Sequence, residues 1–337
     1  MVKKFVLSGY FGFKNFGDEA ILSVLVNKLK QENHKITVIS SDPEFTKSQY
    51  KNIKSVYTFN MPEIVAQIAK SDILVSGGGS LLQDVTSLKS LIYYLTVIFI
   101  ALVLHKKVMI FAQGIGPIKN PFGQFITKAL LSHCTYVSVR DKKSLELMNN
   151  WGIKAELLCD PIFSTQITPV KKNKTVAVQL RNFRTMSDDF IDRLAQKVCQ
   201  EFADYELEIY SFQDSIDLEV CEKFQRAVNL LNSDIKTSLY SGLLNKEIIE
   251  NLSHCEYLIA MRFHAIIIGL LAETKTLSIN YDIKVEKISQ EFNLPMVDLK
   301  KDFKSQFKDL KTQDLENIQE KVKNKTFNWQ GFDNAIK

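Results

Sequence analysis

Nothing in the composition of this 337-residue chain points to a disulfide-rich, zinc-binding or nucleic-acid-binding protein. The five cysteines are an odd number and none of them forms a CxxC pair. This pattern argues against a disulfide framework or a zinc site, and favours a reducing, cytoplasmic location. The net charge of +5 is too small for a dedicated nucleic-acid binder, although it suits anionic small ligands or an anionic membrane surface.

Long apolar runs are also lacking, with one exception in the first half. Leu91–Leu104 is almost wholly apolar and is followed by Lys106 and Lys107. A membrane-spanning helix needs about 20 apolar residues, so this shorter run predicts a helix buried between strands. The alternative is a helix that touches lipid, with the lysines at the headgroups. On that alternative the protein would be peripheral to the inner face of the plasma membrane.

What the chain does contain is a regular alternation of strand and helix patterns, without short repeats or low-complexity tracts. Short apolar or β-branched runs alternate with longer helical patterns, which predicts parallel sheets covered by helices on both faces. The predicted strands are Phe5–Ser8, Ile36–Ser40, Ile73–Ser76, Val108–Ala112, Tyr136–Val139, Glu156–Leu158, Thr175–Leu180, Leu207–Tyr210, Tyr257–Ala260 and Thr276–Ile279.

The alternation pauses once, at a polar stretch with two prolines between Asp160 and Lys174. We therefore expect an N-terminal Rossmann-like domain over residues 1–165, a C-terminal one over 174–310, and a helical tail over 311–337. The predicted fold class is α/β, with two Rossmann-like domains facing across a cleft. Because ligands of open α/β sheets bind beyond the carboxyl ends of the strands, the functional residues are expected just after strands.

Three segments of the first half follow strands and carry glycines, which allow a ligand close to the backbone. Helix starts and bare N–H groups there favour anions, but a tight structural turn is an equally good reading of the first and third segments. We predict substrate-binding residues in all three: Gly12, Gly17 and Glu19, with Asp18 beside them; Gly77, Gly78, Gly79 and Asp84; and Gln113 and Gly114.

In the second half, positively charged residues follow strands. Arg262 and His264 lie two residues apart at a strand-to-helix junction. The planar guanidinium of arginine can bind a carboxylate or phosphate, and the imidazole of histidine can exchange a proton near neutral pH. Arg181 follows another strand, and Tyr281 and Lys284 a third. These residues predict a pocket for a small anion.

Six segments in this order together resemble the polysaccharide pyruvyl transferase family, in particular its CsaB type. They are GYFGFKNFGDEAIL, SGGGSLLQDVTSLKSLIYY, AQGIGPI, SVRDKKS, MRFHA and NYDIKV. The resemblance covers about Gly9 to Val285. Two positions depart from the family pattern: Ile283 replaces a proline, and Phe263 replaces an aliphatic residue in R-L-H. Phe263 could narrow the pocket and so bears on the choice of acceptor.

The resemblance implies a GT-B-like fold and transfer of a pyruvyl group from phosphoenolpyruvate to two sugar hydroxyls. The CsaB type implies an acceptor with N-acetylmannosamine on a lipid-linked cell-wall precursor, and no cofactor or metal beyond the donor substrate. Arg262, His264 and Arg181 map onto the donor site, where Arg262 and His264 are taken as catalytic and His264 is the candidate acid or phosphate partner. Asp18, Glu19 and Asp84 compete as the base, and Asp18 is taken as catalytic. The alternatives are a nucleotide-sugar glycosyltransferase, with Glu286 as a ribose contact, and a non-catalytic polysaccharide-binding protein.

Overall fold

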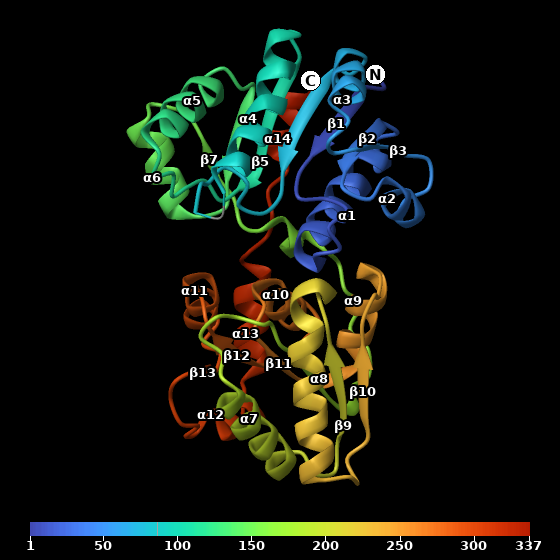
Figure 1. The fold of residues 1–337 in the computed structure, drawn as a ribbon, viewed down its shortest axis with the longest axis vertical. Coiled ribbons are helices and arrows are strands. Elements are labelled where there is room, and N and C mark those ends of the chain that lie inside the picture. The colour runs from blue at the N-terminus through green and yellow to red at the C-terminus, as the bar shows by residue number, and fades with distance from the viewer. Residues whose placement is uncertain (86) are drawn as a thin grey trace. The chain divides into compact units, whose positions relative to one another are not determined.

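The chain divides into two units, each built on its own parallel sheet (Figure 1). The computed structural model describes residues 1–85 and 87–337. The first unit comprises Met1–Ser164 together with Thr326–Lys337, and the second comprises Thr165–Lys325. Both sheets have the doubly wound strand order of a Rossmann-like domain. The predicted α/β class with two such domains is thereby confirmed.

The seven-stranded sheet of the first unit has the order β3-β2-β1-β4-β5-β6-β7, with every neighbouring pair parallel. The order reverses between β1 and β4, which is where a ligand site is expected in such a sheet. The strands are β1 Lys4–Ser8, β2 Lys35–Ser40, β3 Lys54–Tyr57, β4 Ile73–Gly77, β5 Lys107–Gln113, β6 Tyr136–Val139 and β7 Glu156–Leu157.

Helices cover both faces of this sheet. Ile110 of β5 belongs to a core shared with α3, α4 and α5. The next residue, Phe111, points to the opposite face and stacks on Trp329 near the C-terminus, with ring centroids 5.4 Å apart. The helices are α1 Phe16–Gln31, α2 Pro43–Gln49, α3 Met61–Ala69, α4 Leu88–Val103, α5 Pro121–Leu131, α6 Lys142–Asn150, the 3-10 turn η1 Pro161–Ser164 and α14 Gln330–Ile336.

The six-stranded sheet of the second unit has the order β10-β9-β8-β11-β12-β13 and is also parallel. Its strands are β8 Asn173–Gln179, β9 Glu206–Tyr210, β10 Thr237–Tyr240, β11 Cys255–Ala260, β12 Lys275–Asn280 and β13 Met296–Asp298. Its helices are α7 Asp188–Glu201, α8 Asp214–Leu231, α9 Asn245–His254, α10 Phe263–Leu271, α11 Ile283–Glu291, α12 Gln306–Lys311 and α13 Leu315–Lys323.

Every strand predicted from the sequence is present, and the three that were missed are short strands on the outer side of a sheet. In β3 only Val56 is buried, and in β10 no residue is fully buried. An edge strand has one neighbour and half-exposed side chains, so it lacks the continuous apolar run that identifies a buried strand. The C-terminal segment is divided, since residues 311–325 belong to the second unit and 326–337 to the first.

Candidate functional site

The three glycine-containing loops of the first unit come together at the carboxyl edge of its sheet. Strand β4 lies between β1 and β5, so the loops that follow these strands are neighbours. The amide of Gly114 donates a hydrogen bond to the carbonyl oxygen of Gly79 at 3.1 Å. A Cβ atom added to Gly9 would lie 2.6 Å from the carbonyl oxygen of Gly77. The loops are therefore packed backbone against backbone.

Asp18 lies directly over the third glycine of the triplet. It belongs to the first turn of α1 and is only 7% exposed. Gly79 has φ +59°, and a Cβ atom there would be 2.6 Å from Asp18 Oδ1. The amide group of Asn15 donates a hydrogen bond to the other carboxylate oxygen. The bare backbone at Gly79 thus makes room for an acidic side chain of the same unit.

Glu19 is the most unusual ionisable group of this edge. It is 4% exposed, and its Oε1 accepts a hydrogen bond from the amide of Gly12 at 2.6 Å. Its other oxygen, Oε2, is buried and has no hydrogen-bond partner among residues 1–85 and 87–337. Burial, reinforced by the nearby charge of Asp18, raises the pKa of Glu19 to about 8. The carboxyl group therefore holds its proton at neutral pH and fixes the glycine loop as a neutral acid.

This raised pKa gives a testable pH dependence of stability. The unfolded chain releases the Glu19 proton near pH 4.5 and the folded chain near pH 8, so the folded state binds more protons between these values. Its stability therefore falls as the pH rises through that window, by up to about 1.4 kcal/mol per pH unit. Glu19→Gln cannot ionise, and we expect it to remove this loss.

The measurement is the free energy of unfolding of both proteins in denaturant, at about pH 5 and about pH 9. Glu44→Gln is the matched control, because Glu44 is an exposed residue of α2 that pairs with Lys47 at the surface. It should keep the pH dependence of the wild type. If the free energy of unfolding changes equally with pH in the wild type and in Glu19→Gln, Glu19 is ionised in the folded protein.

The other predicted residues of this edge hold loops in place. Both carboxylate oxygens of Asp84 accept a hydrogen bond from the amide of Lys119 at 2.8 Å, and one also accepts from Asn120 at 2.7 Å. These bonds lower the pKa of Asp84. The side-chain amide nitrogen of Gln113 donates a hydrogen bond to Ser76 Oγ at 3.0 Å. Gly17 is buried in the first turn of α1. Both carboxylate oxygens of Asp84, one of the three candidate bases, are therefore engaged by backbone N–H groups.

A buried ion pair beside the glycine triplet was missed by the sequence reasoning. Arg140 donates to Asp160 at 2.7 Å, and both side chains are less than a tenth exposed. Arg140 also donates to Ser80 Oγ at 3.3 Å, directly after Gly79. The signal was present in the sequence, because Arg140 immediately follows a predicted strand, as the positively charged residues chosen in the second half do.

In the second unit, Arg262 is held by a buried carboxylate. It precedes α10 and is 7% exposed, and its Nε and Nη2 donate to the two oxygens of Asp217 at 2.7 and 2.6 Å. Asp217 lies on α8 and is fully buried, which raises its pKa against the opposing effect of Arg262. The Arg262 amide donates to Gln179 Oε1 at 2.7 Å. One edge of the guanidinium is therefore fixed inside the protein, and Asp217 is a further residue that the sequence reasoning missed.

Arg181 and Tyr281 are in contact at the same edge of the sheet. The Arg181 Nη1 donates to the Tyr281 hydroxyl at 3.2 Å, and the guanidinium carbon lies 5.6 Å from the ring centroid. The Nε of Arg181 is buried and has no hydrogen-bond partner in the described part of the chain. Phe183 packs edge-on against the same ring. A buried cationic donor without a partner is costly, and an anionic ligand would satisfy it.

His264 and Lys284 complete the predicted set. His264 is the second residue of α10 and is partly buried, and its ring packs edge-on against Phe263. Lys284 is exposed at the start of α11. Since β8, β11 and β12 are adjacent, the residues that follow them, Arg181, Arg262 and Tyr281, share one end of the sheet.

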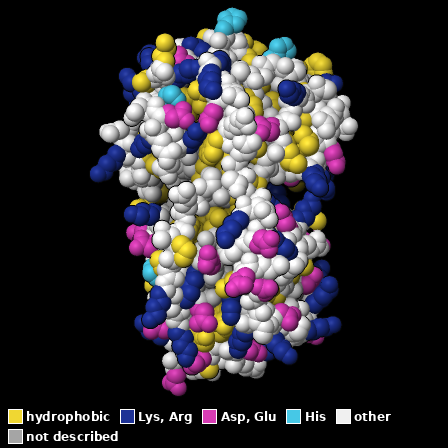
Figure 2. Space-filling view, turned by 180° about the vertical axis from the view of Figure 1, so that it is seen from behind, with side chains coloured by type: hydrophobic (Ala, Val, Ile, Leu, Met, Phe, Trp, Pro, Cys, Tyr) yellow, Lys and Arg dark blue, Asp and Glu magenta, His cyan; other side chains and the backbone are white. Residues whose placement is uncertain are grey.

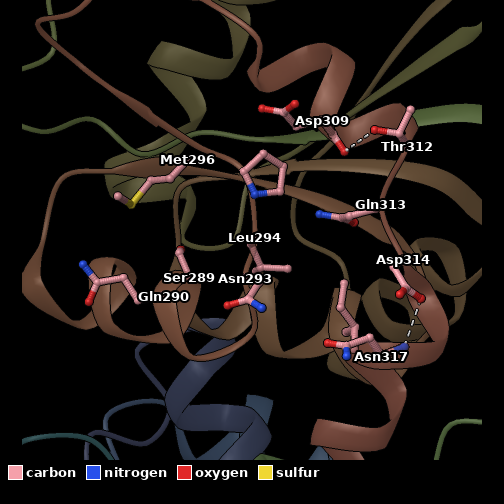
Figure 3. Close-up of a pocket in the computed structure, with 12 residues that line it drawn as sticks. Ser289, Gln290, Asn293, Leu294, Met296, Asp309, Thr312, Gln313, Asp314 and Asn317 are labelled. Atoms are coloured by element: carbon pink, nitrogen blue, oxygen red, sulfur yellow. Dashed lines mark hydrogen bonds between the residues drawn. The ribbon is translucent and has the colours of Figure 1, made fainter.

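Two pockets lie within the second unit. The smaller, of about 290 Å³, is at the carboxyl ends of β12 and β13 and is lined by Tyr281 and Glu286, among others. The larger, of about 770 Å³, lies between α11, α12 and α13 and contains none of the predicted residues (Figure 3). Some of its polar groups already form hydrogen bonds within the protein, for example Gln313, whose side chain bonds both backbone groups of Thr276.

In the described part of the chain, no three His, Cys, Asp or Glu side chains gather as metal ligands.

Comparison with known proteins identifies the family and the fold. The family model described as polysaccharide pyruvyl transferase matches residues 15–283. No curated protein matches the chain. Among solved structures, the UDP-GlcNAc 2-epimerase of Methanocaldococcus jannaschii is similar over 97% of this chain and 94% of its own, with a TM-score of 0.61 and 10% identity.

Two further structures share this architecture. HepE of Anabaena, solved with UDP and glucose, is similar over 99% of this chain and 98% of its own, with a TM-score of 0.60 and 11% identity. The glycosyltransferase SnogD of Streptomyces nogalater is similar over 100% and 98%, with a TM-score of 0.56 and 10% identity. At such low identity these similarities show the fold alone, which is that of GT-B glycosyltransferases and sugar epimerases.

Proposed function

The chain belongs to the polysaccharide pyruvyl transferase family, and on that premise we propose that it transfers the pyruvyl group of phosphoenolpyruvate to two hydroxyls of a sugar. The choice of phosphoenolpyruvate as the donor substrate rests on the residues at the carboxyl edge of the second sheet. There Arg181 presents a buried Nε without a partner in the described chain, beside the Tyr281 hydroxyl. Phosphoenolpyruvate has a carboxylate and a phosphate on three carbons, and such a ligand requires cations close together.

Arg181 and Arg262 have different parts in this proposal. Arg181 is assigned the direct contact with the ligand, because its Nε has no hydrogen-bond partner among residues 1–85 and 87–337. Arg262 is held by Asp217 through its Nε and Nη2, so it adds a fixed positive charge and its position is set before the substrate arrives. Preorganised charge of this kind stabilises the charge that develops in a transition state.

The proposed reaction balances as follows. A proton is added to the methylene carbon of phosphoenolpyruvate, and the adjacent carbon becomes an oxocarbenium centre. A sugar hydroxyl attacks that centre, and the bond to the phosphate oxygen then breaks, so that phosphate leaves with its electron pair. The second hydroxyl attacks the same carbon and closes the ketal. The two hydroxyl protons are balanced by one C–H bond formed and one proton on phosphate.

His264 is the proposed proton donor, and the base is proposed in the first unit. Asp18 is the stronger candidate for the base, because Glu19 already holds a proton at neutral pH and Asp84 is engaged by Lys119 and Asn120. We assign the acceptor to the first unit and propose N-acetylmannosamine of a lipid-linked cell-wall precursor as its sugar. No cofactor is needed beyond the donor substrate.

Gly79 provides a test of Asp18. Gly79→Ala places a methyl group 2.6 Å from Asp18 Oδ1 in a backbone with φ +59°. We expect transfer to be lost and stability to fall, because the carboxylate must move. Gly152→Ala is the matched control, since Gly152 also has a positive φ, +71°, but has open space around the added atom. Gly152→Ala should lower the free energy of unfolding by only about 1–2 kcal/mol, the cost of placing alanine in a left-handed backbone conformation. It should keep activity.

Unfolding free energies and phosphate release measure the two effects. Equal losses of stability and activity in the two glycine variants would mean that the position of Asp18 over Gly79 has no part in the reaction.

The second candidate is a glycosyltransferase that uses a nucleotide sugar. It is favoured by the small pocket lined by Glu286, because an acidic side chain can bind a ribose, and by the UDP bound in HepE. Glu286 here accepts a hydrogen bond from Gln290 at 3.3 Å on its own helix. A binding protein without catalytic activity is the third candidate, and it would have no use for a preorganised Arg262.

Mass spectrometry of a candidate acceptor after incubation with phosphoenolpyruvate decides between these functions. The expected result is a gain of one ketal-linked pyruvate per acceptor, with release of phosphate. Sugar transfer from a panel of UDP sugars, without any effect of phosphoenolpyruvate, would establish the glycosyltransferase. If neither pyruvate nor sugar is transferred but the acceptor still binds, the chain is a binding protein.

A further inference from the structure

Helix α4 is apolar on its outer side as well as on its inner side. Its inner side packs on the sheet through buried residues that include Leu91, Leu95 and Ile98. The outer side presents Leu88, Ile92, Phe99 and Val103, which are 40%, 48%, 53% and 56% exposed. Their spacing of four, seven and four residues keeps them on one side of a helix. A surface helix ordinarily carries polar residues there, so the expectation of a fully buried helix is wrong for this outer side.

The neighbours of α4 extend this exposed surface. Helix α5 packs against α4 (Figure 1) and carries Phe122 and Phe125, which are 67% and 70% exposed. On the other side Phe59 is 69% exposed and packs edge-on against Tyr93 of α4, with ring centroids 6.2 Å apart. We call the following seven residues the apolar face: Phe59, Leu88, Ile92, Phe99, Val103, Phe122 and Phe125.

The charge around the apolar face has one sign. The sequence contains no Asp or Glu between Val85 and Arg140, but it has six Lys and Arg there. Arg140 pairs with Asp160, and Lys107 donates to the carbonyl oxygen of Ala335. The other four border the two helices: Lys89 and Lys106 near the ends of α4, and Lys119 and Lys128 on or before α5.

Asp84 and Glu63 are acidic residues on segments next to this stretch. Asp84 accepts the amides of Lys119 and Asn120, and Glu63 on α3 accepts from Gln67. In the second unit, by contrast, acidic and basic side chains are interspersed over the face drawn in Figure 2. Over residues 85–140 the apolar face is therefore bordered by lysines and by no carboxylate, and the acidic residues beside it come from outside that stretch.

We propose that the apolar face docks on an anionic lipid bilayer, with α4 lying along the surface. The aromatic and aliphatic side chains enter the boundary between headgroups and acyl chains, and the four lysines meet lipid phosphates. Pairing with a second copy of the chain fits less well, because it would bring like charges together without carboxylates from this stretch to balance them. None of the described helices is long and apolar enough to cross a membrane. The inference goes beyond the proposed reaction and does not depend on it.

Co-sedimentation with vesicles tests this proposal on the full chain, without phosphoenolpyruvate or sugar. We expect binding to vesicles of equal parts phosphatidylcholine and phosphatidylglycerol, and weaker binding to phosphatidylcholine alone. The double variant Phe99→Asp with Phe125→Asp should bind at least about tenfold more weakly. Leu230→Asp is the matched control, because Leu230 is an 88% exposed apolar residue of the second unit and should leave binding unchanged.

A second variant keeps the test independent of the phenylalanines. Lys89→Glu with Lys128→Glu changes only exposed charges, so we expect it to fold, to lose the preference for phosphatidylglycerol and to flatten the dependence on salt. Circular dichroism checks the fold of each variant. Absence of binding by the wild type, or equal binding by wild type and both variants, overturns the proposal. So does a wild-type dimer that Phe99→Asp dissociates while vesicles bind neither form.

Discussion

Arg262→Ala is expected to abolish transfer and also to destabilise the second unit by about 3–5 kcal/mol. The reason is Asp217, which is fully buried and bonded to two guanidinium nitrogens of Arg262. Removing the cation leaves an uncompensated charge in the interior, or forces the carboxylate to take up a proton. The loss is to be measured as the free energy of unfolding at neutral pH. The sequence alone predicted a catalytic role for Arg262, but not its contribution to stability.

A double substitution separates the two roles of Arg262. Replacing a buried ion pair by apolar residues of similar volume is often neutral or stabilising, so Arg262→Met combined with Asp217→Leu should recover part of the stability lost in Arg262→Ala. The recovery is incomplete because Asp217 Oδ2 also accepts hydrogen bonds from the amides of Phe212 and Gln213, each at 3.1 Å, and leucine cannot. The double variant should not recover transfer, because the positive charge is gone. Asp217→Asn alone is expected to be destabilising, but to keep the guanidinium in place and to retain part of the activity. Transfer by the double variant at the wild-type rate would limit Arg262 to a structural role.

The comparison of Asp18 with Glu19 shows how far sequence reasoning reaches into the site. The alternation of apolar runs was enough to predict that the loops after β1, β4 and β5 lie together, because parallel strands end at one edge. It could not separate two adjacent carboxylates. Asp18 lies over Gly79, whereas Glu19 turns back to the amide of Gly12 and keeps a proton. That difference depends on which backbone groups each carboxylate contacts, and these contacts are decided by the packing of loops distant in sequence.

Asp217, unlike Arg140, is not marked by any signal in the sequence. Asp217 contacts Arg262 across 45 residues of sequence, and nothing in the local pattern of α8 distinguishes it from the other acids there. A buried carboxylate is recognised by its partner, and the partner is known only from the fold. Likewise the run Leu91–Leu104 predicted a helix, but which of its sides stays exposed is decided by how α4 packs on the sheet.

His264→Ala is expected to lower kcat by about 10²–10⁴-fold with little change in the stability of the second unit. A positioned proton donor contributes an effect of this size, and the step assigned to His264 is protonation of the methylene carbon of phosphoenolpyruvate. His264 is only partly buried at the start of α10, so truncating it should remove little packing. Phosphate release at saturating donor measures kcat, and unfolding in denaturant measures stability.

His254→Ala is the matched control, because His254 is also partly buried and ends helix α9 of the same unit. It should keep wild-type turnover. His264→Gln adds a further distinction, since glutamine can hydrogen-bond a phosphate but cannot deliver a proton near neutral pH. If His264 protonates carbon, Gln and Ala variants should be equally slow while the KM for phosphoenolpyruvate stays lower in Gln. If His264 only binds phosphate, the Gln variant should recover kcat, and the proton donor must be sought elsewhere. The carboxyl group of Glu19, still protonated at neutral pH, would then be the next group to test.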